Sequence, residues 1–177
     1  MRIIVLIICL LSLHFNCSSQ ISETKPHYIG EKFGGGIIFY LDETGQHGLI
    51  AGTKNYLGIR WCKTQYENKA LRAYNMTDGK ENTDLIVKIA GDMSGSHLCG
   101  NLNIDGYKDW YLPSIKELTL LYSQLMKVGG FIMADYWSST EDIKKNNRAW
   151  AVRFAKAGKE FTARKYEKFA VRPIRKF

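Results

Sequence analysis

Beyond Tyr136 the chain alternates between apolar residues and small or charged ones, which is the pattern of a half-buried β-strand. Trp150, Val152 and Phe154 are the apolar members of the clearest run. A turn and two further strand-like segments follow, at residues 157–159, 161–166 and 169–174. Successive side chains of a strand point to opposite faces of a sheet, so this period of two does not suit a helix. The pattern predicts a C-terminal antiparallel β-meander.

The rest of the chain predicts two short helices and one hairpin. Residues 82–90 have a polar start followed by apolar positions, and a second helix is expected after Pro113. Ser114 and Glu117 have the spacing of a capping box at its start, and apolar residues then recur on one face. Residues 34–41 and 48–51 are strand-like segments joined by a turn, which predicts a hairpin. A few helices among many short strands indicate an α+β domain.

The N-terminal residues have the composition of an export signal. Residues 3–13 form an uncharged apolar run after Arg2, too short to span a bilayer. Cys17 stands where a bacterial lipoprotein signal places the cysteine that is lipidated. Ordinary signal-peptidase cleavage near Ser19 is the alternative, because small residues also precede that position. Both routes put the domain outside the cytoplasm, in the cell envelope or secreted. The expected organisation is a signal peptide at 1–17, a tether at 18–30 and one domain at 31–177.

Cys62 and Cys99 are the two cysteines that remain once the export signal is removed. In an oxidising compartment a disulfide is the simplest expectation for such a pair. Closing this loop would stabilise the fold by about 3–4 kcal/mol. A redox pair and two buried free thiols are the alternatives, and the redox pair lacks the usual CxxC spacing.

Several segments together resemble one family. The most specific are residues 109–114, Asp-Trp-Tyr-Leu-Pro-Ser, and residues 136–139, Tyr-Trp-Ser-Ser. The other segments occur in the same order, at residues 35–41, 44–49, 79–83, 149–150 and 171–175. Together they resemble the domain of unknown function typified by the C-terminal domain of the Legionella collagen-like protein.

The resemblance implies a C-type-lectin-like fold, distantly similar to the formylglycine-generating enzyme and to phage receptor-binding domains. Members of the family are mostly surface or secreted modules, and the namesake is an adhesin that recognises sulfated glycosaminoglycans. This chain lacks a collagen-like stalk, so trimerisation is not implied. It also lacks the Glu-Pro-Asn motif of calcium-dependent lectins. Trp110 and Trp137 lie in the family motifs, and we expect them to pack in the core rather than to stack on sugar.

Residues suited to metal binding or catalysis are sparse. Asn101, Asn103 and Asp105 have the spacing that begins a calcium loop, but Leu112 stands where the bidentate glutamate is required, so a simple turn is the alternative. The histidines form no paired-ligand motif, and no Gly-x-Ser-x-Gly occurs. We therefore expect a protein that is not an enzyme and needs no cofactor or metal, with an enzyme of the formylglycine-generating type as an alternative.

Positive charge is concentrated at the C-terminal end. Residues 141–177 hold 12 basic and 4 acidic side chains, an excess that equals the net charge of +8 for the whole chain. Because nucleic acid is not an expected partner outside the cell, this excess indicates an acidic polysaccharide or a sulfated glycan. The candidate ligand-binding residues flank the turns of the predicted meander: Arg148, Arg153, Lys156, Lys159, Arg164, Lys165 and Lys168. A solvated face that keeps a structural envelope lipoprotein soluble is the alternative.

Overall fold

The computed structural model describes residues 25–177, so the predicted signal peptide, the lipidation site at Cys17 and most of the predicted tether lie outside the described residues. The strands are β1 (Lys32–Phe33), β2 (Gly36–Leu41), β3 (Gly48–Ala51), β4 (Tyr56–Arg60), β5 (Asp135–Glu141), β6 (Arg148–Arg153), β7 (Lys159–Arg164), β8 (Lys168–Val171) and β9 (Ile174–Lys176). The helices are α1 (Gly79–Ala90), α2 (Gly95–Gly100), α3 (Ile115–Ser123) and α4 (Leu125–Val128), with a 3₁₀ turn at Thr64–Tyr66. No helix within these residues is long and apolar enough to cross a membrane.

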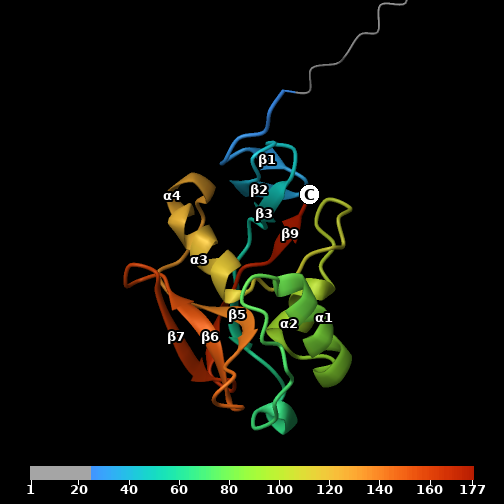
Figure 1. Ribbon diagram of the computed structural model, residues 1–177, viewed down its shortest axis with the longest axis vertical. Coiled ribbons are helices and arrows are strands. Elements are labelled where there is room, and N and C mark those ends of the chain that lie inside the picture. Colours follow the sequence, from blue (N-terminus) through green and yellow to red (C-terminus); the bar gives the residue numbers. More distant parts are fainter. Residues whose placement is uncertain (1–24) are drawn as a thin grey trace, which may run out of the picture.

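The strands form two sheets that lie toward opposite ends of the molecule (Figure 1). The first sheet has the order β1-β2-β3-β9 and the second β4-β8-β5-β6-β7. All neighbours are antiparallel except β5 and β8. In Figure 1, α3 and α4 lie along one side of the molecule and α1 and α2 along the other. The domain is therefore α+β, as the sequence predicts.

Two of the predicted elements form for the reasons that the sequence suggests. The Ser114 side chain accepts a hydrogen bond from the Glu117 backbone, and the Glu117 side chain accepts one from the Ser114 backbone, so the capping box that starts α3 is present. The predicted hairpin is β2 and β3, paired in antiparallel register. Helix α2 was not predicted because its six residues begin and end with glycine and show no apolar period.

The predicted C-terminal meander is correct only for part of its length. Strands β5, β6 and β7 follow one another as neighbours in an antiparallel arrangement. Strand β8 instead inserts between β4 and β5, and β9 joins the other sheet beside β3. Side-chain alternation predicts strands but not their neighbours, because pairing is decided by contacts between distant segments.

The tryptophans of the two most specific family motifs, Trp110 and Trp137, lie in the core. Trp110 is 1 % exposed and Trp137 is fully buried, and Trp61 is fully buried as well. Trp137 donates its indole N–H to the Ile59 carbonyl oxygen at 3.0 Å, and Trp61 donates to that of Ser138 at 2.8 Å. Their faces are covered by neighbouring side chains, so none of the three offers a stacking surface to a sugar.

The structure does not contain the predicted disulfide. Cys62 and Cys99 are free thiols, and both are fully buried in one hydrophobic cluster together with Trp61 and Trp137. Burial raises the pKa of the Cys62 thiol to about 12 and also raises the pKa of Cys99. Each cysteine packs as a small apolar side chain, which is the buried-thiol alternative rather than the disulfide.

Candidate functional site

Lys165 does not lie on the surface, so its assignment as a ligand-binding residue is corrected. Its side chain is fully buried. The Lys165 ammonium pairs with Glu141 and donates to the Lys69 carbonyl oxygen at 2.8 Å. The Glu141 carboxylate also accepts the backbone N–H groups of Leu71 and Arg72 at 2.9 and 2.8 Å. A buried carboxylate requires a compensating charge, and Lys165 supplies it.

The remaining candidates on β6 and β7 do not share one face of the sheet. Arg148 lies directly opposite Arg164, and Arg153 lies opposite Lys159. Because the register is continuous and side chains alternate, the first pair projects from one face and the second pair from the other. Arg153 and Arg164 therefore cannot contact the same group on a ligand.

The two opposed pairs also differ in charge compensation. Arg153 donates to both oxygens of Asp135, at 2.8 and 3.0 Å. Neither Arg148 nor Arg164 forms an ion pair with any of residues 25–177. Like charges directly opposite each other destabilise a sheet. We refer to Arg148 and Arg164 as the arginine pair.

The other three predicted cations, Lys156, Lys159 and Lys168, are exposed. Lys156 lies in the turn between β6 and β7, and Lys168 lies on β8 opposite Arg60. Lys156 and Lys159 share this turn, where the Lys159 backbone N–H donates to the Lys156 carbonyl oxygen at 3.1 Å. The turn is at the other end of the β6–β7 ladder from the arginine pair and Lys168 is on a different strand, so these lysines do not combine with the arginine pair into one surface.

A hollow of about 500 Å³ lies on the face that carries the arginine pair. Trp150 and Thr162 are directly opposite each other, two residues along their strands from Arg148 and Arg164. We call this the Trp150 hollow. Its lining residues are Tyr74, Met76, Glu141, Asp142, Ile143, Lys144, Lys145, Trp150 and Thr162. Trp150 is half-buried and packs against the core, so part of its ring is available to a ligand.

The loop between β5 and β6 adds two exposed lysines to this hollow. Asp142 Oδ1 accepts the backbone N–H of Lys144 at 2.9 Å, and the Asp142 carbonyl oxygen accepts that of Lys145 at 3.2 Å. The backbone N–H of Arg148 then donates to the Lys145 carbonyl oxygen at 2.9 Å. This turn fixes the backbone from which Lys144 and Lys145 project.

Sequence reasoning missed Trp150, Lys144 and Lys145 as candidate site residues. The usable signal was an Asp-x-Lys-Lys turn just before a strand, with an aromatic residue two positions after an arginine. Alternation puts that arginine and that tryptophan on the same face. Tyr74 and Met76 carry no such signal, because only folding brings them to this sheet.

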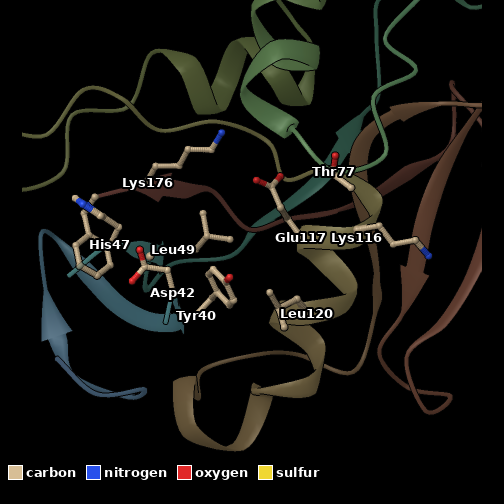
Figure 2. A pocket seen from close by; sticks show the side chains of 11 residues that line it. Tyr40, Asp42, His47, Leu49, Thr77, Lys116, Glu117, Leu120 and Lys176 are labelled. Atoms are coloured by element: carbon tan, nitrogen blue, oxygen red, sulfur yellow. The ribbon is translucent and has the colours of Figure 1, made fainter. Parts of the chain in front are cut away.

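A second hollow, of about 530 Å³, lies near the hairpin of β2 and β3 (Figure 2). We call it the Tyr40 pocket. Its lining residues are Tyr40, Asp42, His47, Gly48, Leu49, Thr77, Lys116, Glu117, Leu120, Lys176 and Phe177. Figure 2 shows Asp42 and His47 on one side, Lys176 on another, and Tyr40 close to Leu120.

Glu117 forms part of the wall of the Tyr40 pocket and joins three segments of the chain. Its Oε2 accepts the backbone N–H groups of Gly79 and Ser114, at 2.9 and 2.8 Å, and its Oε1 accepts the Tyr111 hydroxyl at 2.9 Å. Burial raises the pKa of this carboxyl above its usual range. Because both oxygens have partners within the domain, Glu117 holds the wall in place.

The described residues contain no cluster of three or more histidine, cysteine, aspartate or glutamate side chains that could hold a metal ion. In the segment with calcium-loop spacing, Asp105 and Gly106 form a tight turn with φ angles of 52° and 87°. Asp109 is held by Arg175, whose Nε and Nη2 lie 2.7 and 2.9 Å from its carboxylate oxygens. The segment has the geometry of a turn, the alternative to a calcium loop.

The fold of this chain is similar to that of a solved structure. A fimbrial protein from Bacteroides ovatus has a similar structure, with a TM-score of 0.53 and 18% sequence identity. The similarity covers 80% of this chain, which spans 44% of the length of the fimbrial protein. At this identity the likeness concerns the fold alone. A search of curated proteins found no match.

Residues 53–175 match the Lcl C-terminal domain family. Since the match extends over more than half of the chain, the protein belongs to the Lcl C-terminal domain family.

Proposed function

We propose that this protein is a non-catalytic extracytoplasmic binding module that recognises acidic or sulfated glycans through the Trp150 hollow and the arginine pair. The observation that carries the proposal is the arginine pair itself: Arg148 and Arg164 are directly opposite each other in the register of β6 and β7, and neither has a carboxylate partner among residues 25–177. The Arg148 guanidinium donates to Thr162 Oγ1 at 3.0 Å, so it is held beside the Trp150 hollow. An anionic ligand between the two arginines would relieve their repulsion.

The residues around the arginine pair have the chemistry that an acidic sugar requires. The planar fork of arginine matches sulfate and carboxylate geometry, and Lys144 and Lys145 add positive charge at the rim. Trp150 offers an indole surface on which the apolar face of a sugar ring can pack. Within the hollow, the charge of Glu141 is already neutralised by Lys165.

The position of the hollow suits a surface protein. The described chain enters at the end of the molecule that holds β1, β2 and β3, whereas the loop between β5 and β6 lies toward the opposite end (Figure 1). The loop therefore lies at the end of the domain that is remote from the start of the described chain. Family membership and the fold shared with a fimbrial protein support this role. We also propose that the α+β fold of this domain is of the C-type-lectin-like kind.

The proposal is tested by binding to immobilised heparin and to a non-sulfated acidic polysaccharide. The double variant Lys145→Glu/Arg164→Glu should elute at much lower salt than the wild type, and Trp150→Ala should weaken binding without changing the net charge. The matched control is Lys156→Glu/Lys159→Glu, which makes the same charge change at exposed positions outside the hollow and should stay close to the wild type. Circular dichroism checks that each variant is folded.

Three outcomes would contradict the proposal. Equal loss in both double variants would mean that net charge alone drives retention. Full retention of Lys145→Glu/Arg164→Glu would exclude the Trp150 hollow. No retention of the wild type would favour a structural lipoprotein without a small ligand.

A further inference from the structure

The Trp150 hollow and the Tyr40 pocket share a wall. Tyr74 and Met76 line the hollow, and Thr77, the next residue, lines the pocket. Lys116 reinforces this wall, because its backbone N–H donates to the Met76 carbonyl oxygen at 3.1 Å. The Lys116 side chain lines the Tyr40 pocket and extends away from Tyr40, toward the C-terminal strands (Figure 2). A ridge that includes the backbone at Met76 and Lys116 thus lies between the two hollows.

The two hollows differ in charge. Both lysines that line the Tyr40 pocket have carboxylate partners: Lys116 Nζ lies 3.2 Å from Glu160, and Lys176 Nζ lies 2.9 Å from Asp78. The arginine pair beside the Trp150 hollow has none among the described residues. The hollow therefore suits an anionic group, whereas the pocket suits an uncharged one.

The Tyr40 pocket combines an apolar surface with fixed polar groups. Leu49 and Leu120 contribute the apolar part, and Tyr40 is 41 % exposed. The Asp42 carboxylate is fixed by Thr44, which donates its hydroxyl at 2.7 Å and its backbone N–H at 3.0 Å. An aromatic ring next to oriented hydrogen-bonding groups suits a sugar ring with free hydroxyls.

We infer that the two hollows form one binding tract for an extended acidic oligosaccharide, with an anionic unit at the arginine pair and an uncharged unit against Tyr40. This inference rests on the proposed function and names its ligand as a polymer segment that crosses the ridge at Met76 and Lys116, rather than a single acidic sugar. With volumes of about 500 and 530 Å³, each hollow lies in the range that holds a small ligand.

The test uses hyaluronan-derived oligosaccharides of defined length, in which acidic and uncharged sugars alternate, from disaccharide upward, measured by isothermal titration calorimetry on the processed protein. The wild type should gain about tenfold or more in affinity once the oligosaccharide is long enough to reach the pocket, because the second contact then becomes intramolecular. Tyr40→Ala and His47→Ala should lose this gain and bind the short oligosaccharides as the wild type does. Arg164→Glu should bind every length more weakly. Tyr28→Ala removes another exposed tyrosine, outside both hollows, and should behave as the wild type.

The failures of the two proposals are distinguishable. Absence of binding at every length, with folded protein, overturns the proposed function and this inference with it. Affinity that does not depend on length overturns the inference alone. The same holds if Tyr40→Ala and His47→Ala keep the full gain, because the pocket then does not contact the longer chain.

Discussion

Two groups of cations in the C-terminal strands have opposite surroundings. Lys165, Arg172 and Arg175 are buried, whereas Arg148 and Arg164 reach the solvent. Each buried cation is held by several acceptors within the domain. The two solvent-accessible arginines lie opposite each other, and neither has a carboxylate partner within residues 25–177.

The buried Arg172 guanidinium is surrounded by hydrogen-bond acceptors. Its guanidinium donates to Asn55 Oδ1 at 2.9 Å and to the carbonyl oxygens of Gly130 and Gly129, each at 3.2 Å. It also lies 4.4 Å from the centre of the Phe131 ring. Burial lowers the pKa of Arg172 to about 10, although it remains charged at neutral pH.

This comparison shows that the excess positive charge of the C-terminal strands has two separate roles. Part of it holds buried segments together, and part of it is available to a ligand. Removing a buried cation should lower the free energy of unfolding, whereas removing a solvent-accessible one should lower affinity and leave the fold unchanged. The three predictions below concern one buried cation, one buried acid, and the half-exposed acid that pairs with the buried Arg175.

The largest effect is expected for Lys165→Met. The substitution leaves the Glu141 carboxylate buried without its counter-charge, so the free energy of unfolding should fall by about 3–5 kcal/mol. Urea denaturation monitored by tryptophan fluorescence measures the loss. In contrast, heparin affinity of the protein that remains folded should match the wild type.

The double variant Lys165→Met/Glu141→Leu is the control for that prediction. It removes the unpaired charge and should recover part of the loss, but not all, since the N–H groups of Leu71 and Arg72 lose their acceptor. A loss below about 1 kcal/mol in Lys165→Met would show that the pair is solvated, and the distinction between the two groups of cations would fail.

An intermediate effect is expected for a buried acid, Glu117→Gln. The amide keeps one acceptor oxygen but places an NH₂ group against N–H donors, so a loss of about 1–3 kcal/mol is expected in urea denaturation. Glu43→Gln makes the same change at an exposed position and should alter stability by less than about 0.5 kcal/mol. Equal effects in the two variants would mean that the hydrogen bonds of Glu117 do not stabilise the fold.

The smallest effect is expected for Asp109→Asn, since Asp109 is half exposed. Hydrogen bonding to Arg175 holds the pKa of Asp109 below its usual value. A depressed pKa gives stability that is present above the unfolded value of about 3.9 and is lost as the pH falls through the folded value. At pH 7 the variant should lose at most about 1 kcal/mol after screening by solvent. Urea midpoints at pH 7 and pH 3 check this, and the difference between variant and wild type should be smaller at the lower pH.

The sequence predicts local structure well where the signals are local. The capping box at Ser114 and Glu117 and the strand signal around Trp150 each depend on residues close together in the chain, and the structure has the capping box and the strand. The strand is not half-buried as predicted, because Ala151 is buried as fully as Val152. The place of β8 could not be predicted in this way, because its pairing with β4 brings together Arg60 and Lys168. Such pairings depend on the sum of tertiary contacts rather than on either segment alone.

The candidate site was predicted in part for the same reason. The arginine pair belongs to the predicted set, since Arg148 and Arg164 flank turns of the predicted meander. Nothing in the local sequence distinguishes Lys165 from the neighbouring lysines and arginines. In the structure it is buried because it pairs with Glu141, 24 residues away. The Tyr40 pocket combines the N-terminal hairpin with α3 and β9, so no single stretch of sequence carries its pattern.

Strand β9 has a consequence for the order of folding. It completes the first sheet by pairing with β3, so Leu49 finds its partner Lys176 only after all the residues between them have been synthesised. Closing so long a loop is slow, because its entropy is lost before the contacts form. The first sheet should therefore remain incomplete until β9 has been made, although β2 and β3 can already pair as a hairpin.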